Sequence, residues 1–179
     1  MTERHGTSVP ASARGMTRGV VFVHSCPKAI TSHVEWALSD IVDFRVTLDW
    51  SAQSVEPGSV RAELSWTAPV GTAARIVSAL HSWGRLRLEV TEEGTLATEG
   101  ERFSVTPSLG IYRAVIGIHG DIQIPEERLR GAIARAALTG NLLEDEISVL
   151  LGAAWDAELE PFRFAGDANS VRWLHQVVS

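Results

Sequence analysis

The order of the hydrophobic patterns in the first half of the chain constrains the fold more than any other feature. Residues 19–25, GVVFVHS, form a continuous apolar run, which is typical of a strand buried on both faces. Residues 28–42 then repeat apolar side chains at helical spacing, and residues 44–50 alternate between apolar and polar. This succession predicts a strand, a helix and a second, half-buried strand.

A second unit of the same kind follows the turn-rich stretch SAQSVEPGS. Residues 60–66 alternate as a strand, residues 73–83 carry a helical stripe that ends at Gly84, and residues 85–90 alternate again. The order strand, helix, strand, strand, helix, strand is the split βαβ pattern. We therefore predict an α+β fold with a ferredoxin-like βαββαβ core, in which right-handed crossovers place both helices on one face of the sheet.

The opposite face of this predicted sheet would carry charged residues of both signs. They are the polar members of the alternating strands: Arg45, Asp49, Arg61, Glu63, Arg87 and Glu89. Such a ladder is usually a solvated face with weak cross-strand pairs. The rest of the chain or a partner could also cover it.

The second half of the chain predicts a β-hairpin followed by helices. Residues 102–124 have strand character, with a hairpin tip at 118–121. A helix begins after Pro125, and one long helix over about 142–160 is closed by Pro161. We divide the chain into a disordered tail, 1–17, and one α+β domain, 18–179. In that domain the hairpin and helices of 101–179 pack on a ferredoxin-like unit, 18–93.

Composition excludes several classes of function. The net charge of −6 argues against a general binder of nucleic acid, and no apolar run approaches the roughly 18 residues that span a bilayer. The first residues lack the apolar centre of a signal peptide, and the single Cys26 cannot form an internal disulfide. We expect a cytoplasmic protein that binds neither nucleic acid nor membrane.

A reactive or metal site, if the chain has one, would lie around His24, Cys26 and His33, which fall within ten residues at the junction of the first strand and helix. Imidazole and thiolate are ligands for transition metals, and a cysteine at a helix N-terminus can have a lowered pKa. No CxxC or HExxH spacing supports a metal centre, however, and no carboxylate pair or GxSxG motif indicates a catalytic machinery. A backbone-bonded histidine, a packed cysteine and an exposed helical histidine account for the same pattern, so we expect no cofactor and no bound metal.

A surface for a partner is the other candidate site. Tryptophan and arginine are enriched at the centres of protein interfaces. We therefore nominate Trp36, Arg45, Arg61, Arg87 and Trp173, while packing of Trp36 against the C-terminal segment is the simpler alternative. The partner would be an unidentified protein or a small ligand, and a homodimer is possible.

Several strings together resemble one known family: TRGVVFVHSCP, VTLDW, RAELSW, GDIQIPEERLR and AWDAELEPFRFAG. The chain is similar, from Met16 to its end, to an uncharacterised family of small actinobacterial proteins described only as a domain of unknown function. The resemblance supplies no catalytic residues. Members are often encoded near genes of dissociated fatty-acid synthesis, which implies a role beside acyl chains or their carrier protein.

These observations lead to two hypotheses. The first is a non-catalytic interaction or regulatory protein. If its partner is an acidic acyl carrier, Arg45, Arg61 and Arg87 are the residues expected to contact it. The second is a small enzyme or metal-binding protein centred on His24, Cys26 and His33. We favour the first because the chain shows no catalytic constellation.

Overall fold

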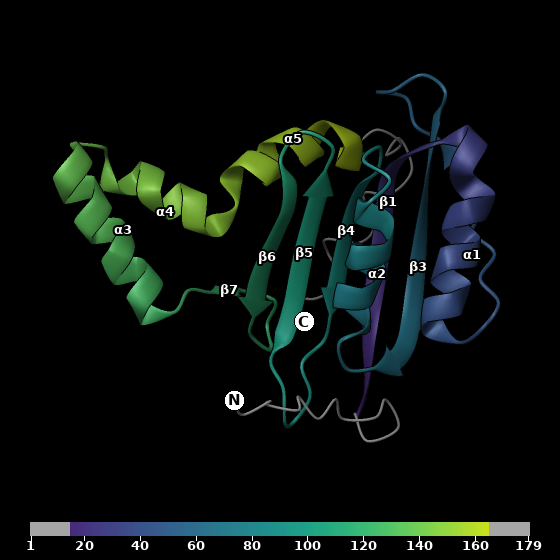
Figure 1. Cartoon of the computed structure of the whole chain (residues 1–179), viewed down its shortest axis with the longest axis horizontal. Coiled ribbons are helices and arrows are strands. Elements are labelled where there is room, and N and C mark those ends of the chain that lie inside the picture. Colours follow the sequence, from purple (N-terminus) through teal and green to yellow (C-terminus); the bar gives the residue numbers. More distant parts are fainter. Residues whose placement is uncertain (1–14, 165–179) are drawn as a thin grey trace, which may run out of the picture.

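The computed structural model of the protein describes residues 15–164. Over these residues the chain forms one seven-stranded antiparallel sheet and five α-helices (Figure 1). The strands are β1 (Met16–Pro27), β2 (Ser51–Ala52), β3 (Ser59–Pro69), β4 (Arg87–Glu92), β5 (Gly100–Thr106), β6 (Gly110–Ile116) and β7 (Ile122–Gln123). The helices are α1 (Thr31–Val42), α2 (Thr72–His81), α3 (Glu126–Thr139), α4 (Leu143–Leu151) and α5 (Ala153–Phe164), and a short 3-10 turn, η2 (Lys28–Ile30), precedes α1.

The sheet has the strand order β2-β3-β1-β4-β5-β6-β7. β1 lies between β3 and β4 and is antiparallel to both. Strands β5, β6 and β7 then follow one another as an antiparallel meander, with the predicted hairpin tip between β6 and β7. The α+β class is therefore confirmed, and the sheet is larger than a simple ferredoxin-like unit.

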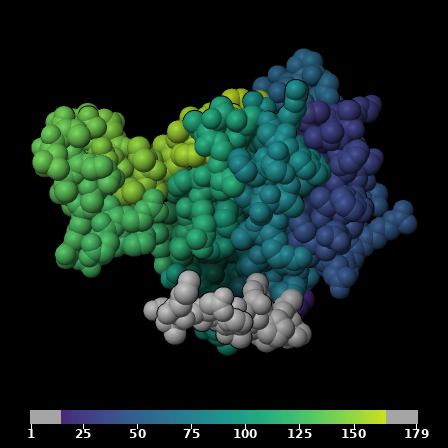
Figure 2. Space-filling model, in the orientation of Figure 1, coloured from purple at the N-terminus to yellow at the C-terminus, as the bar shows by residue number. Residues whose placement is uncertain are grey.

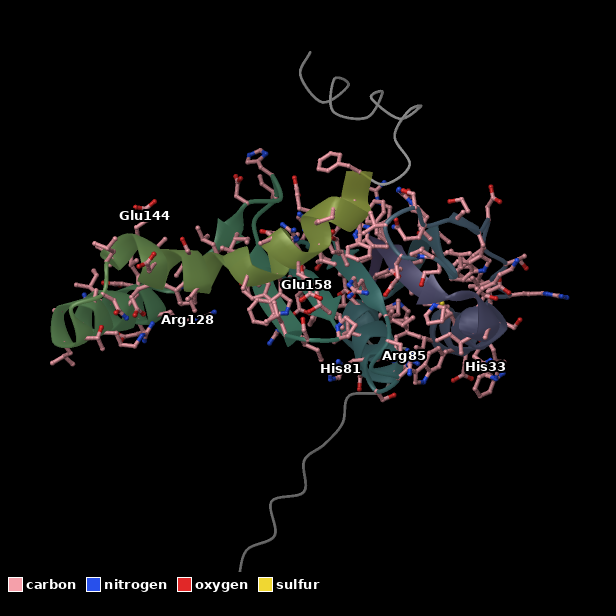
Figure 3. All side chains as sticks on the ribbon, turned by 90° about the horizontal axis from the view of Figure 1, so that it is seen from above. His33, His81, Arg85, Arg128, Glu144 and Glu158 are labelled. Carbon is pink, nitrogen blue, oxygen red and sulfur yellow. The ribbon has the colours of Figure 1, made fainter. Side chains whose placement is uncertain are left out.

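The two faces of the sheet are covered by different helices. α1 and α2 lie side by side on one face, and α5 crosses the other face near one end of β5 and β1 (Figures 1 and 3). The main core fills the space under α1 and α2. It includes Val21 and Val23 of β1, Leu88 and Val90 of β4, and Ile76 of α2, all nearly inaccessible to solvent.

The predicted strand over residues 44–50 is wrong, although its alternation is real. Val46 and Leu48 are buried, yet this segment joins no ladder, and β2 is only Ser51–Ala52. The backbone amides bond to α1 instead: Val46 N–H donates to Ser39 Oγ at 2.9 Å and Leu48 N–H to Glu35 Oε1 at 2.9 Å. Because side chains of the helix satisfy these amides, the segment runs beside α1 without a strand neighbour.

The single long helix predicted over 142–160 is two helices. Gly152 has φ +78° and ends α4, and α5 begins directly after it. The ring of Tyr112 packs onto this glycine so closely that a Cβ there would lie 2.7 Å from Tyr112 Cε1. Pro161 does not close the helix, because α5 continues through it to Phe164.

The boundary predicted at residue 17 is also shifted. Met16 and Thr17 belong to β1 and pair with Pro69 and Ala68 of β3. Residues 1–14 lie outside the described range, as does Trp173.

Close packing at Gly19 generates a prediction about stability. Gly19 pairs with Trp66, and a Cβ at this position would lie 2.1 Å from Trp66 Cζ2 and 2.4 Å from the carbonyl oxygen of Thr91. Gly19→Ala should therefore lower the free energy of unfolding by about 1–3 kcal/mol, the usual cost of overpacking, as measured by urea denaturation. The control is Gly15→Ala, where nothing lies within 4 Å, and an equal loss in both variants would show that the close contact is not the cause.

Candidate functional site

A cluster of buried charges lies between the sheet and α5. Its centre is Glu89 of β4, which points away from α1 and α2 because its neighbours Leu88 and Val90 face those helices. Glu89 is 8% exposed and accepts hydrogen bonds from three cationic or ionisable side chains. The distances are 2.7 Å from His24 Nε2, 2.8 Å from Arg102 Nη2, and 2.9 and 2.7 Å from Arg163 Nε and Nη2.

Asp156 of α5 balances the charge of the cluster. Its Oδ1 accepts from Arg163 Nη2 at 2.6 Å and from Arg102 Nη2 at 3.1 Å, so two carboxylates face two guanidinium groups. Burial alone would raise the pKa of Glu89, but the hydrogen bonds from His24 and Arg163 outweigh it and hold that pKa far below its usual range. Burial likewise lowers the pKa of Arg163, and its bonds to Glu89 and Asp156 raise it above the usual value.

A second ion pair extends the cluster along the same strand. Arg87 lies under the ring of Phe162, with its guanidinium carbon 4.4 Å from the ring centroid. Its Nη1 is 3.2 Å from Glu56, and its Nε is 3.5 Å from Glu158. The hydroxyl of Ser25 also donates to Glu56. Burial raises the pKa of Glu56, but the bond from Ser25 and the charge of Arg87 lower it by more.

Gln53 connects the strand and the helix that enclose the cluster. Its amide nitrogen donates to the backbone carbonyls of His24, at 2.7 Å, and Phe162, at 3.3 Å. The carboxylates and guanidinium groups at the centre of the cluster are engaged with one another. A charge-balanced network of this kind can hold α5 on the sheet, and it engages both carboxylate oxygens of Glu89, whereas Asp156 is bonded through Oδ1 alone.

A shallow hollow of about 290 Å³ adjoins the cluster on the part of the sheet that α5 does not cover. Phe22 and His24, whose rings are nearly parallel with centroids 6.0 Å apart, line one side. Asp49, Arg61 and Glu63 line the other, and none of these three forms an ion pair with a residue in 15–164. Arg61 Nη1 is buried there without a hydrogen-bond acceptor from the described residues.

The structure does not bring His24, Cys26 and His33 together. His24 belongs to the charge cluster, Cys26 is fully buried in the core under α1, and His33 is exposed on α1 (Figure 3). His24 and Cys26, two residues apart, would share a face in a regular strand, but the register of β1 shifts between Val23 and Cys26. Burial raises the pKa of the Cys26 thiol to about 12, which is the opposite of an activated thiol.

The nominated partner residues fall in different surroundings. Trp36 is 73% exposed on α1, and Arg45 is exposed in the segment after it. Arg61 lines the hollow, whereas Arg87 lies under Phe162 and is already paired with carboxylates. Trp173 lies outside the described residues.

Most members of the cluster were not predicted from the sequence. Arg87 and Glu89 were placed on the correct face by their alternation, but Arg102, Asp156 and Arg163 were not connected to them. The alternation of β5 could have placed Arg102 beside Glu89, because the two strands are consecutive. Asp156 and Arg163 reach the cluster because α5 crosses the sheet at this point. No local pattern in the sequence predicts that crossing.

Among residues 15–164 we find no group of three or more histidine, cysteine or acidic side chains positioned to hold a metal ion. In the same range, no helix is both long enough and apolar enough to cross a membrane.

Comparison with known proteins places the chain in a family. The model of the family described as "Protein of unknown function (DUF3145)" matches residues 20–176. No curated protein and no solved structure matches the chain.

Neutralising the centre of the cluster should destabilise the protein. Glu89→Gln leaves Arg102 and Arg163 partly uncompensated, so we expect the free energy of unfolding at pH 7 to fall by about 3–5 kcal/mol. The matched control is Glu93→Gln, which removes an exposed pair with Arg18 and should cost no more than about 1 kcal/mol. Equal effects in both variants would contradict a structural role for the cluster.

The same carboxylate should make stability depend on pH. The pKa of Glu89 is lower in the folded protein than in the unfolded chain, so its stabilising contribution is present above the unfolded value of about 4.3 and declines as the pH falls below it. Denaturation curves at pH 7 and pH 3 should therefore differ more for the wild type than for Glu89→Gln. An identical pH dependence in the two proteins would show that Glu89 titrates normally.

Cys26 should behave as an inert thiol. With a pKa of about 12 its thiolate fraction near pH 8 is roughly a thousandfold smaller than that of a free cysteine, whose pKa is about 8.5. Reaction with a disulfide reagent should be slow in buffer and fast in denaturant. Rapid labelling of the native protein at pH 7 would instead support the hypothesis of an enzyme that uses Cys26.

Proposed function

The chain belongs to the DUF3145 family, and we propose that it functions as a non-catalytic interaction or regulatory protein that binds an acidic partner through α1 and α2. The observation that supports this most is the exposure of Trp36. A tryptophan that is 73% exposed on a helix is a typical anchor for a protein partner, because its burial contributes much of the binding free energy.

The arginines support the same surface. Those on the α5 side are largely paired, as described above for Arg87, Arg102 and Arg163. Arg45, Arg75 and Arg85, which lie in or beside the α1–α2 layer, are exposed and form no ion pair with residues 15–164.

Two histidines add polar donors to this layer. His33 on α1 and His81 at the end of α2 are both exposed, and Figure 3 places them on the same side of the molecule as Arg85. Glu35, Asp40 and Asp43 on and after α1 match the three arginines in number, so the layer is aromatic and of mixed charge, and an acidic partner would be held by the exposed arginines individually.

An acyl carrier protein is the acidic partner that the family resemblance suggests, and we keep it as the specific form of the proposal. The structure revises which arginines would contact it. Arg45 remains a candidate, and Arg75 and Arg85 join it. Arg61 is withdrawn because it lines the hollow on the opposite face, and Arg87 because its guanidinium is already engaged. The expected restriction to actinobacteria, the link to fatty-acid metabolism and a cytoplasmic location belong to the same proposal.

We also propose that β1 to β4 with α1 and α2 form a ferredoxin-like unit. The order β2-β3-β1-β4, the antiparallel pairing of β1 with both neighbours and the placement of both helices on one face support this interpretation. Strands β5 to β7 and the last three helices are additions to that unit.

The alternative, an enzyme or metal protein centred on His24, Cys26 and His33, receives less support. These side chains point into the charge cluster, into the core and into solvent, respectively. No shared position brings one substrate or ion within reach of all three.

Binding to purified acyl carrier protein, measured by calorimetry, tests the proposal. We expect the wild type to bind, Trp36→Ala to weaken binding at least tenfold, and the triple change of Arg45, Arg75 and Arg85 to glutamate to abolish it. The control is Arg18→Glu, which reverses an exposed arginine on the opposite face of the sheet. Binding that survives both surface variants would refute this surface, and no binding by the wild type would remove the acyl carrier as the partner.

A further inference from the structure

We propose that the protein forms a two-fold symmetric homodimer in which each chain lays a helical arm, residues 126–151, against the partner copy. The arm consists of α3, α4 and the turn between them. Figures 1 and 2 show it projecting from the side of the molecule beyond β6 and β7. α3 and α4 pack chiefly against each other, and the arm joins the rest of the chain through β7 and α5.

Apolar side chains of the arm, which would normally be buried in a core, are exposed to solvent. Leu129 and Ile133, one turn apart on α3, form an apolar stripe of the kind that usually faces a core, yet both are substantially exposed. Ala132 is the buried residue of α3 and Leu150 that of α4. The exposed large apolar side chains of the arm are Leu129, Ile133, Leu138, Leu142, Leu143, Val149 and Leu151.

The most exposed of these residues lie where the chain's own sheet does not cover them. Leu138 is 86% exposed and Leu142 is 68% exposed, at the turn that joins α3 to α4. Figure 1 shows this turn at the outer end of the arm, away from the sheet. A concentration of apolar surface at the end of a projection is a sign of an interface, since monomeric proteins seldom expose such patches.

The size of the arm favours a second copy over a different protein. α3 has 14 residues and is therefore about 21 Å long, and two packed helices are about 20 Å wide, so one face of the arm covers roughly 400 Å². A stable dimer buries about 800 Å² on each partner. A different protein bound to this face would bury only the roughly 400 Å² of one arm. In a two-fold dimer each chain buries its own arm on the partner and also buries the surface that the partner's arm covers, so each copy buries about 800 Å².

A receiving surface lies at the same end of the sheet. β7 pairs only with Val115 and Ile116 of β6, and Trp155 Nε1 of α5 donates to the carbonyl oxygen of Gly110 at 3.1 Å, so the outer edge of β6 from Ile111 to Ala114 has no strand neighbour among residues 15–164. Leu109 and Ile111 are also exposed there. A strand edge without a strand neighbour, next to apolar side chains, is a surface that proteins usually protect, and the partner's arm would cover it.

Sedimentation of the full-length protein tests the dimer. The molecular mass of the wild type measured by sedimentation equilibrium should be twice the 19.4 kDa mass of the chain. The double variant Leu138→Glu/Leu142→Glu should raise the dimer dissociation constant at least a hundredfold, because each copy would bury two new charges. Both leucines are exposed within one chain, so the variant itself should still fold. At a concentration low enough for the wild type to dissociate, the two proteins should have the same circular dichroism spectrum and the same melting temperature.

The matched control is Leu96→Glu, which changes a fully exposed leucine in the loop between β4 and β5 and should leave the dimer intact. A second variant, Ile133→Glu, tests the stripe on α3 independently of the arm's end. A wild type that sediments as a monomer, or a double variant that remains a dimer, would overturn the proposal, whether or not a different protein binds the arm. This inference is independent of the surface proposed on α1 and α2.

Discussion

The hydrogen bonds to Glu89 are the interaction on which the second layer of this protein depends. A carboxylate that is 8% exposed on β4 would be strongly destabilising unless it were paired, and Arg163, Arg102 and His24 all donate to it. Arg163 comes from α5, so the pairing fixes that helix to the face of the sheet opposite α1 and α2. Asp156, one further contributor from α5, completes the charge balance. The position of α5 in turn determines the direction in which α4 and α3 leave the body.

This arrangement separates the ionisable groups into those used for stability and those left on surfaces. The groups around Glu89 and Arg87 face one another, and Cys26 lies in the core. Among the accessible surfaces are the layer of α1 and α2, which exposes Trp36 and three arginines that form no ion pair within residues 15–164, and the apolar arm beyond β6. In the function that we propose, exposed Trp36 and the exposed leucines of the arm are the groups that would contact other molecules.

Local patterns predicted much of this fold, and the failures have physical causes. The apolar run of β1, the stripes of α1 and α2 and the hairpin tip between β6 and β7 are where their periodicity places them, because each reports burial along one element. Val46 and Leu48 in residues 44–50 are buried alternately with exposed neighbours, but their backbone amides bond to Ser39 and Glu35 of α1. A hydrophobic pattern reports burial only, so it cannot distinguish this arrangement from a strand that pairs in a sheet. The break at Gly152 depends on the ring of Tyr112, 40 positions earlier in the chain. Likewise, the alternation of β4 predicts which face of the sheet carries Glu89. It cannot predict Asp156 and Arg163 as its neighbours, because they come from α5, which is far from β4 in the sequence.

The most direct test of the central role of Glu89 is a double-mutant cycle with Arg163. The free energies of unfolding of the wild type, Glu89→Gln, Arg163→Gln and the double variant would be compared at pH 7. If this pair holds α5 on the sheet, the losses in the single variants should exceed, in sum, the loss in the double variant by at least about 1 kcal/mol. Additivity within about 0.5 kcal/mol would mean that other contacts hold α5 on the sheet and that Glu89 does not have this central role.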